Sequence, residues 1–325
     1  MMDIYGTLGP RCADAETLER MLRLGMTGVR LNLSHVTLPE SAAMVEALHT
    51  AALRAGVKAK LLIDMQGPEI RVGKLAEPLR LETGARCAVE SLRLPEAVRA
   101  ALAPGQELLL DDGKLLLRCE DADTAEVLRG GMLQSRKSAA LPGKEIRLPA
   151  LTESDRQNLA VAKDYGVTGV MQPFVRDRHD LEQVRAALPD GVRLFAKIES
   201  LTGVKQLESL IEEADEIVIA RGDLGNAVPL WDLPVLQKRI GALCRERQVP
   251  FMVVTQMLAS MEHSPVPTRA EVSDIANAVL DGAASVMVTG ETAVGEYPVE
   301  VMRYLCETVR AAERYKKGMS QNISF

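Results

Sequence analysis

The sequence predicts an α/β fold, a (β/α)8 barrel of the TIM type, with a small β-rich domain inserted after its third strand. Two observations predict the barrel: short apolar runs alternate with longer amphipathic stretches along most of the 325 residues, and eight such pairs can be identified. A third observation, that residues 73–147 break the alternation, predicts the insertion. The same alternation also occurs in open doubly wound sheets, so the pattern alone leaves two topologies.

The expected strands are short and rich in aliphatic residues, as parallel strands covered on both faces are. Several follow a glycine by a few residues, which is typical of a helix C-cap and a short loop before a strand. They are residues 4–8, 28–33, 60–64, 168–172, 193–198, 216–220, 250–255 and 284–289.

Amphipathic patterns between these strands predict helices. Residues 13–24 and 41–54 place apolar side chains at three- and four-residue spacings. Thr152 is followed three residues later by Asp155, a capping-box variant that predicts the start of another helix.

Residues 73–147 contain β-like pieces instead. "ELLLDDGKLLLRCED" and "DTAEVLRGGMLQS" resemble hairpins, with turn signals at Asp112-Gly113 and Gly130-Gly131. We therefore expect a barrel formed by residues 1–72 and 148–325, with a small β lid domain at 73–147.

Composition excludes several classes of protein. A net charge of −6 argues against nucleic acid or anionic membrane as a partner, so an anionic ligand would need local cations. The five cysteines are scattered, with no C-x-x-C pair, which favours reduced thiols over a disulfide framework or zinc site. The start "MMDIYGTLGP" has no signal-peptide pattern, and no apolar run approaches the roughly 18 residues of a membrane span. A cytoplasmic protein is expected.

Polar and charged residues gather where the expected strands end. Strand alternation puts Arg30, Asn32 and Ser34 on one face, and it does the same for Lys197 with Glu199. Each such residue alone is more often a loop residue or a structural ion pair. In a barrel, however, all strand ends meet on one rim, where active sites lie. So many charges there are costly unless they are paired or bind a ligand.

The residue types at this rim suit phosphoryl chemistry with a metal. Glu199 and Asp223 are hard oxygen ligands on neighbouring strands, as Mg²⁺ sites use. The cations Arg30, Arg71, Lys197 and Arg221 supply the positive charge that phosphoryl groups need. The glycines of "IVIARGDLG" let the backbone of the 221–225 turn approach a ligand closely.

Seven motifs together resemble the pyruvate kinase family. They are "GMTGVRLNLSH", "LLIDMQGPEIRVG", "LPALTESDRQNL", "AKIES", "IVIARGDLG", "VVTQMLASM" and "PTRAEVSDIANAVLDGAASVMVTGETAVGEYP", in family order over about residues 4–310. The resemblance implies Mg²⁺-dependent phosphoryl transfer from phosphoenolpyruvate to ADP, giving pyruvate and ATP, in a barrel with a mobile lid. It also implies K⁺ as a second cofactor, and Mn²⁺ as a substitute for Mg²⁺.

The resemblance implies roles residue by residue. Glu199 and Asp223 match the Mg²⁺ ligands, Lys197 the lysine on the transferring phosphoryl group, and Arg30 an arginine facing the phosphate. Thr255 matches the position where the enolate is protonated, with Ser273 arranging a water, and the backbone of Arg221, Gly222 and Asp223 meets the substrate carboxylate. The K⁺ position corresponds to Asn32, Ser34, Asp64 and the carbonyl of Met65, and the nucleotide position to His35, Arg71, Asn32 and Lys137.

Some positions depart from the family pattern. Met65 and Gln66 replace a common threonine and lysine, Pro173 replaces a serine, and Ser138 and Ala140 interrupt the lid-exit motif. The chain ends shortly after the eighth expected helix, so we expect the family's C-terminal regulatory domain to be absent. A homodimer through the barrel, near "PTRAEVSD", remains open.

Two other functions remain open from the sequence. A metal-dependent lyase or aldolase acting on pyruvate enolate would use a similar barrel, but it needs neither a lid nor Arg71. A catalytically impaired paralogue that binds ligands or partners would be expected to have lost Lys197, Glu199 or Asp223. All three are present.

Overall fold

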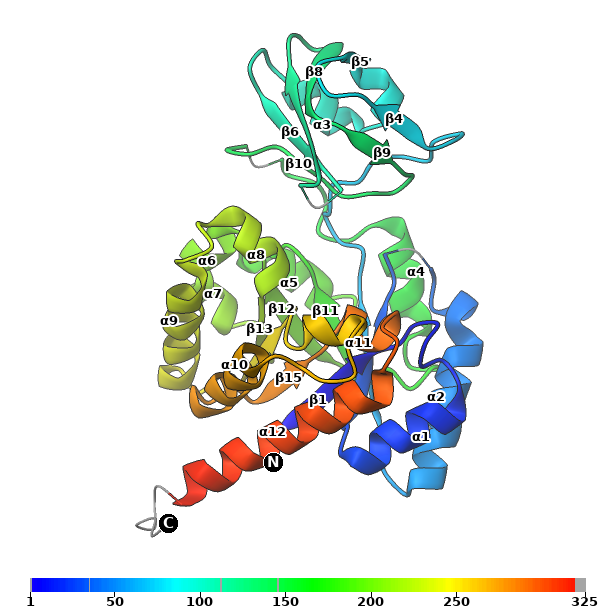
Figure 1. The fold of residues 1–325 in the computed structure, drawn as a ribbon, viewed down its shortest axis with the longest axis vertical. Helices are drawn as coiled ribbons and strands as arrows, with labels where there is room; N and C mark the ends of the chain where they lie inside the picture. Colours follow the sequence, from blue (N-terminus) through cyan, green and yellow to red (C-terminus); the bar gives the residue numbers. More distant parts are fainter. Residues whose placement is uncertain (1, 35, 112, 145, 319–325) are drawn as a thin grey trace. The chain divides into compact units, whose positions relative to one another are not determined.

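The computed structural model describes residues 2–34, 36–111, 113–144 and 146–318, and the chain divides into two compact units (Figure 1). The first unit consists of Met1–Gly67 and Ala150–Phe325, and the second of Pro68–Pro149. The segment expected as an insertion, 73–147, lies within the second unit.

Eight parallel strands close the first unit into a barrel, in the order β1-β15-β14-β13-β12-β11-β3-β2. They are β1 (Asp3–Thr7), β2 (Gly28–Asn32), β3 (Lys60–Asp64), β11 (Gly169–Gln172), β12 (Arg193–Ile198), β13 (Glu216–Ala220), β14 (Phe251–Val254) and β15 (Ser285–Met287). Because β1 pairs with both β2 and β15, the sheet has no edge, and the closed barrel is confirmed over the open sheet.

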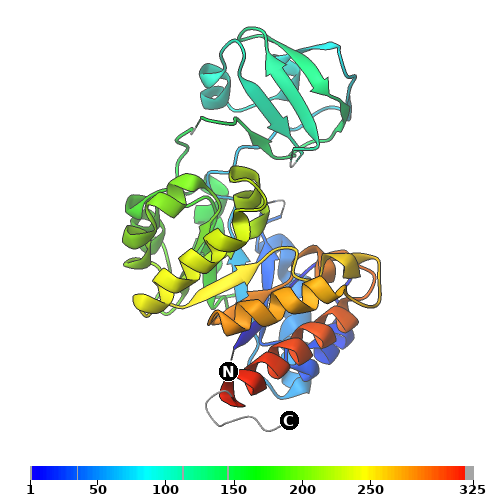
Figure 2. The same cartoon turned by 60° about the vertical axis from the view of Figure 1, so that its left-hand side comes forward.

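Helices surround these strands. They are α1 (Ala15–Leu24), α2 (Ala42–Ala55), α4 (Glu153–Val161), α5 (Arg178–Arg185), α6 (Leu201–Lys205), α7 (Leu207–Ile211), α8 (Arg221–Ala227), α9 (Leu233–Glu246), α10 (Arg269–Leu280), α11 (Gly290–Ala293) and α12 (Pro298–Gly318). Short 3₁₀ helices cover Pro39–Ser41 and Ala259–Glu262. The last helix, α12, packs against α1 and α10. The first and last helices of the barrel therefore lie side by side (Figures 1 and 2).

The barrel has two apolar layers, separated by strand alternation. Val29, Leu31 and Leu33 point outward and pack with the buried faces of the helices. The interior is filled by a separate cluster: Tyr5, Leu62, Met171, Phe195, Val218, Ala220, Met252, Val254 and Met287. The interior is therefore a packed core, and polar groups must gather at its ends.

A buried carboxyl group, that of Glu216, lies at the amino ends of the strands. Glu216 is 2% exposed and accepts hydrogen bonds from Ser285 Oγ and, at 2.9 Å, from Arg193 Nη2. Burial raises the pKa of Glu216 above its ordinary 4.5, although the Ser285 hydroxyl and the Arg193 guanidinium oppose this. Since the folded pKa is raised, Glu216 stabilises the fold below its ordinary pKa, and this contribution is lost as pH rises through the folded value.

Glu216→Gln is therefore expected to gain stability relative to the native protein as pH rises from 5 to 8, because glutamine cannot ionise. Urea unfolding at both pH values measures this difference. A difference in unfolding free energy that stays constant between pH 5 and 8 would contradict it.

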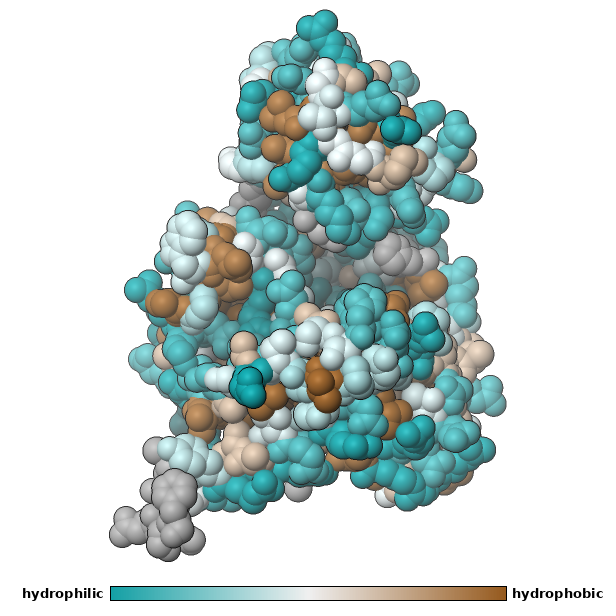
Figure 3. Space-filling view, viewed as in Figure 1, coloured by the Kyte–Doolittle hydropathy of each residue, from teal (hydrophilic) through white to brown (hydrophobic). Residues whose placement is uncertain are grey.

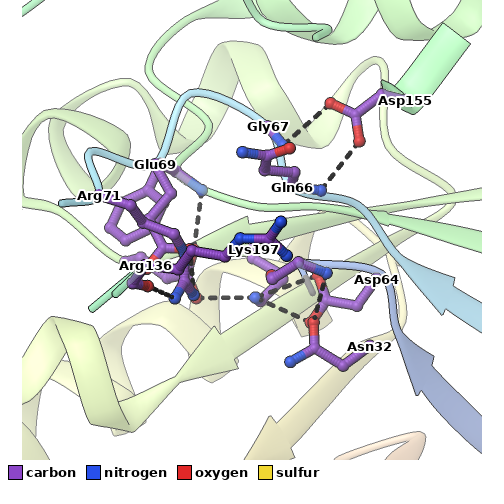
Figure 4. Close-up of polar contacts among 12 residues, drawn as sticks. Asn32, Asp64, Gln66, Gly67, Glu69, Arg71, Arg136, Asp155 and Lys197 are labelled. Atoms are coloured by element: carbon purple, nitrogen blue, oxygen red, sulfur yellow. Dashed lines mark hydrogen bonds and ion pairs between the residues drawn. The ribbon is translucent and has the colours of Figure 1, made fainter. Parts of the chain in front are cut away.

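The expected capping box at Thr152 is confirmed, and it also anchors the chain that leaves β3. Asp155 is 1% exposed and accepts hydrogen bonds from the Thr152 backbone N–H (2.9 Å) and hydroxyl (2.8 Å). The same carboxylate accepts from the backbone N–H of Gln66 (2.9 Å) and Gly67 (3.0 Å), as Figure 4 shows. One side chain thus fixes both segments that connect the first unit to the second.

Asp155→Ala is expected to lower the free energy of unfolding by about 3 kcal/mol, because it leaves several buried donors without an acceptor. Asp14→Ala provides the control, because Asp14 caps α1 at an exposed position and its loss costs about 1 kcal/mol. Urea unfolding measures both. Equal losses in the two variants would contradict the anchoring role.

The second unit is a small β structure with its own apolar core. A five-stranded sheet has the order β10-β6-β7-β8-β5, and β4 pairs with β9. These strands are β4 (Leu79–Leu81), β5 (Arg86–Ala88), β6 (Glu107–Leu110), β7 (Leu115–Cys119), β8 (Thr124–Arg129), β9 (Gly131–Leu133) and β10 (Ala139–Ala140), with α3 (Glu96–Ala101) and a 3₁₀ helix (Val89–Leu92).

One of the two expected hairpins in this unit is present. β6 and β7 form an antiparallel pair around Gly113, while Asp112 lies outside the described residues. The hairpin expected at Gly130-Gly131 was wrong, because β8 pairs with β5 and β7 whereas β9 pairs with β4. A Cβ atom on Gly130 would lie 2.3 Å from the Leu81 carbonyl oxygen, so this glycine is needed for close packing where the chain passes between the sheets.

The visible surface is mostly polar, with apolar surface gathered over α6 and α8 (Figure 3). Leu201, at the start of α6, is 45% exposed, and Leu230, shortly after α8, is 70% exposed. Among the described residues, no helix combines the length and the apolar character that a membrane span requires.

Candidate active site

The charged cluster at the carboxyl ends of the strands begins on β12. Phe195 lies in the barrel interior, and the two-residue period of a strand places Lys197 and Glu199 on the same face, further along. Lys197 Nζ lies 3.0 Å from Glu199 Oε1, and the Glu199 side chain is only 2% exposed. The predicted shared face of these two residues is confirmed.

Asp64, at the end of β3, links this pair to β2. Its carboxylate lies 2.6 Å from Arg30 Nη2 and 3.1 Å from Lys197 Nζ. The side chains of Arg30, Asp64 and Lys197 are 14%, 3% and 13% exposed, so the network is largely shielded from water. Figure 4 shows Asp64 and Lys197 facing each other.

The network fixes the charge of its members. Burial opposes ionisation of Asp64, but Lys197 and Arg30 more than offset it and hold the pKa of the carboxyl below its ordinary value. Burial likewise disfavours the Lys197 ammonium, yet Asp64 and Glu199 raise the pKa of the lysine above its ordinary value. Lys197 is therefore a permanent cation at the centre of the cluster.

Glu199 behaves differently, because its charge is only partly compensated. Burial raises its pKa to about 7, Lys197 opposes this, and the nearby carboxylates of Asp223 and Asp64 add to it. One oxygen is fixed by the backbone N–H of Phe174 at 2.7 Å. Glu199 is buried and Asp223 is half-buried, and two carboxylates that repel each other match a divalent cation, which would neutralise both. Glu199 and Asp223 therefore fit Mg²⁺ or Mn²⁺.

The turn after β13 lies against the loop after β14. Gly222 approaches Thr255 so closely that a Cβ atom on the glycine would lie 3.0 Å from the threonine methyl group. Thr255 has φ +78° and Gln256 has φ +55°. Two successive non-glycine residues in this region, one of them β-branched, store strain of about 1–3 kcal/mol each. Such strain requires neighbouring groups that hold the loop.

The Arg221 side chain supplies part of this support. Its Nη2 and Nε donate to the Thr255 carbonyl oxygen at 2.7 and 3.2 Å, and its Nη1 lies 2.6 Å from Asp274 Oδ2. The positive charge of Arg221, which we expected to serve a phosphoryl group, is thus paired with a carboxylate in the structure. The guanidinium, whose side chain is 11% exposed, pairs with Asp274 on α10.

The residues expected around K⁺ lie at the ends of β2 and β3. The strand register places Asn32 beside Asp64, and Asn32 Oδ1 accepts a hydrogen bond of 3.2 Å from the Ser34 backbone N–H. Met65 is 1% exposed and follows Asp64 directly. Together these four residues offer carboxylate, amide, hydroxyl and carbonyl oxygens, which are hard donors.

Four other residues were expected at the site: Arg71, Lys137, His35 and Ser273. Arg71 and Lys137 belong to the second unit, where Arg71 pairs with Glu69 (2.7 Å) and Lys137 pairs with Asp111 (2.8 Å). His35 lies outside the described residues. Ser273 is exposed on α10, and its hydroxyl lies 3.5 Å from the Asn277 amide of the same helix.

The sequences of known proteins match this chain over nearly its whole length. The family described as "Pyruvate kinase, barrel domain" matches residues 1–302. The chain belongs to the pyruvate kinase family. Proteins named "Pyruvate kinase" from Corynebacterium efficiens and Aeropyrum pernix are 39% and 37% identical to it, over 95% and 97% of this chain and 69% and 71% of their own lengths. "Pyruvate kinase 2" from Synechocystis is 35% identical, over 98% of this chain and 58% of its own length.

The chain thus spans between 58% and 71% of the length of these pyruvate kinases. Within the span that it shares with them, the structure brings Arg30, Asp64, Lys197 and Glu199 into one network, and it places Asp223 near Glu199.

Sequence reasoning missed two supporting residues of this candidate site. Asp274 pairs with Arg221, and the backbone N–H of Phe174 fixes Glu199. Asp274 lies in the quoted "PTRAEVSD" motif, where a carboxylate on the half-buried face of a helix could have signalled a partner. The Phe174 contact had no sequence signal, because a backbone N–H is common to almost every residue.

Proposed function

We propose that the chain catalyses transfer of the phosphoryl group of phosphoenolpyruvate to ADP, giving pyruvate and ATP. The observation that carries this proposal is the buried Arg30–Asp64–Lys197–Glu199 network with Asp223 beside it. It combines fixed cations with a carboxylate pair that suits a divalent metal. Phosphoryl transfer asks a protein mainly for positioning and charge neutralisation, which this cluster supplies.

Glu199 and Asp223 would hold Mg²⁺ or Mn²⁺. When bound, the metal supplies a Lewis acid that neutralises charge on the substrate's phosphoryl and carboxylate oxygens. Burial of Glu199 and its repulsion by Asp223 prepare the pair for a cation, and the Phe174 N–H holds Glu199 in place. The backbone of the 221–223 turn would meet the substrate carboxylate, as the resemblance implies.

Lys197 and Arg30 would stabilise the charge that moves during the reaction. The phosphorus–oxygen bond of phosphoenolpyruvate breaks, an oxygen of the ADP β-phosphate bonds to phosphorus, and the enolate C3 then takes a proton to form the methyl group of pyruvate. Lys197 remains protonated throughout, because two carboxylates raise its pKa. Asp64 holds both cations toward the same place, since it pairs with each of them.

Protonation of the enolate would take place at Thr255, with Ser273 arranging a water. Thr255 lies against Gly222, next to the proposed metal ligand Asp223, which supports this position. K⁺ would lie among Asn32, Ser34, Asp64 and the Met65 carbonyl, and it would share the Asp64 carboxylate with Arg30 and Lys197.

The second unit would act as a lid that supplies nucleotide contacts. Arg71 and Lys137 carry the charges for this role, and His35 and Asn32 would contribute from the first unit. Closure of a lid excludes water and so favours transfer to ADP over hydrolysis.

Assembly as a homodimer through the barrel, near the start of α10, also remains a proposal. It is supported by Val266, whose side chain is 55% exposed there.

Following the phosphoryl group tests the proposed function. Phosphorus NMR of phosphoenolpyruvate, ADP and Mg²⁺ with the protein should show the substrate resonance lost as the γ-phosphate of ATP appears in equal amount. Release of inorganic phosphate without ATP would overturn the proposal. So would a folded protein that binds phosphoenolpyruvate and leaves it unchanged, which is the behaviour of an impaired paralogue.

A further inference from the structure

The loop after β14 holds Thr255 in a conformation that its own sequence disfavours. Thr255 and Gln256 both have left-handed backbone angles, φ +78° and +55°. A β-branched residue crowds its own backbone there, so the local preference would return the chain to an extended form. Neighbouring groups must impose this conformation.

The Arg221 guanidinium is placed to do so. It donates from Nη2 and Nε to the carbonyl oxygen of Thr255, at 2.7 and 3.2 Å, and Nη2 also lies 3.0 Å from the Met257 sulfur. Two N–H groups of one rigid fork on a single carbonyl fix the direction of that peptide group. The Arg221 side chain is 11% exposed, so water competes little for these bonds.

Asp274 fixes the guanidinium in turn. Its Oδ2 lies 2.6 Å from Arg221 Nη1, on the side of the fork away from Thr255, and Gln237 Oε1 lies 3.4 Å from the same nitrogen. Asp274 comes from α10, Arg221 from the start of α8, and Thr255 from the end of β14. The three residues therefore join the carboxyl ends of two strands to a neighbouring helix.

We propose that Asp274 acts through Arg221 as a positioning residue for proton transfer at Thr255. This inference rests on the proposed function, in which the enolate is protonated at that residue. The threonine side chain lies against Gly222, so a change in the Thr255 backbone would move its hydroxyl relative to the 221–223 turn. Phosphoenolpyruvate binding would depend less on this support. It uses the side chains of Glu199, Asp223, Arg30 and Lys197, and it uses the 221–223 backbone, which a change of the Arg221 side chain leaves in place.

Exchange of the C3 hydrogens of pyruvate for deuterium tests the proposal. Exchange breaks one methyl C–H bond to give the enolate and then forms a C–D bond with a deuteron from solvent, so it reports proton transfer alone. Proton NMR in D₂O, with Mg²⁺ and ATP present, follows it. Asp274→Asn and Arg221→Lys should slow exchange by about tenfold, while the Kd for phosphoenolpyruvate changes by less than about twofold.

Arg185→Lys is the matched control. Arg185 binds the Glu213 carbonyl and pairs with Asp215 at 2.7 Å, which is the same chemistry at the amino ends of β12 and β13, where it should leave exchange unchanged. Native exchange rates in both Asp274→Asn and Arg221→Lys would overturn the positioning role. An equal loss of exchange and of phosphoenolpyruvate affinity would also overturn it, as a general structural effect. A native chain without exchange would instead overturn the proposed function itself.

Discussion

Glu199→Gln is expected to lower Mg²⁺-dependent pyruvate formation by about a thousandfold, because it removes one of the two charges that would hold the metal. The same change should not destabilise the metal-free protein at pH 8. Burial, together with Asp223 and Asp64, raises the pKa of Glu199 to about 7. The carboxyl therefore favours the folded state below its ordinary 4.5 and loses this contribution as pH rises through about 7.

The variant should thus gain stability relative to the native protein between pH 5 and 8 in the presence of EDTA, as urea unfolding measures. Glu291→Gln is the matched control. Glu291 is 1% exposed and accepts hydrogen bonds from the backbone N–H groups of Leu258 and Thr289, so its loss should cost stability while Mg²⁺ dependence is kept. A Glu199→Gln protein that keeps native Mg²⁺ affinity would contradict the metal assignment.

Lys197→Met is expected to lower kcat by about a thousandfold, because it removes a preorganised cation from the place where charge develops. The Kd for phosphoenolpyruvate should change much less, since Arg30 and the metal ligands remain. Steady-state kinetics and calorimetry separate the two effects.

Lys60→Met controls for loss of an ion pair in the barrel. Lys60 pairs with Asp3 at 2.5 Å at the amino ends of the strands and should leave kcat unchanged. If Lys197→Met lowered affinity and kcat in proportion, Lys197 would act in binding and not in the transition state.

Periodicity made much of this architecture predictable. All eight expected strands are present, within a few residues at their ends, because parallel strands inside a ring of helices have distinctive apolar runs. The same period of two predicted that Lys197 and Glu199 share a face. The periodicity could not predict how the strands of the second unit pair after Gly130, because packing against Leu81 decides that pairing.

Contacts between segments that are distant in the chain could not be predicted from the sequence. Arg30, Asp64 and Lys197 were each expected at the rim, but their pairing depends on the strand order of the closed barrel. Arg221 shows the limit most clearly. Its position directly after a strand predicted that its side chain binds an anionic ligand. In the structure the side chain contacts Asp274 and the Thr255 carbonyl oxygen.

One measurement tests the central claim most directly: the rate of pyruvate formation from phosphoenolpyruvate by the native chain, with ADP, Mg²⁺ and K⁺ each omitted in turn. The account predicts a rate that needs ADP and Mg²⁺ and that K⁺ increases. Pyruvate formation that continues without ADP or without Mg²⁺ would contradict it, and so would its absence from folded protein with all three present.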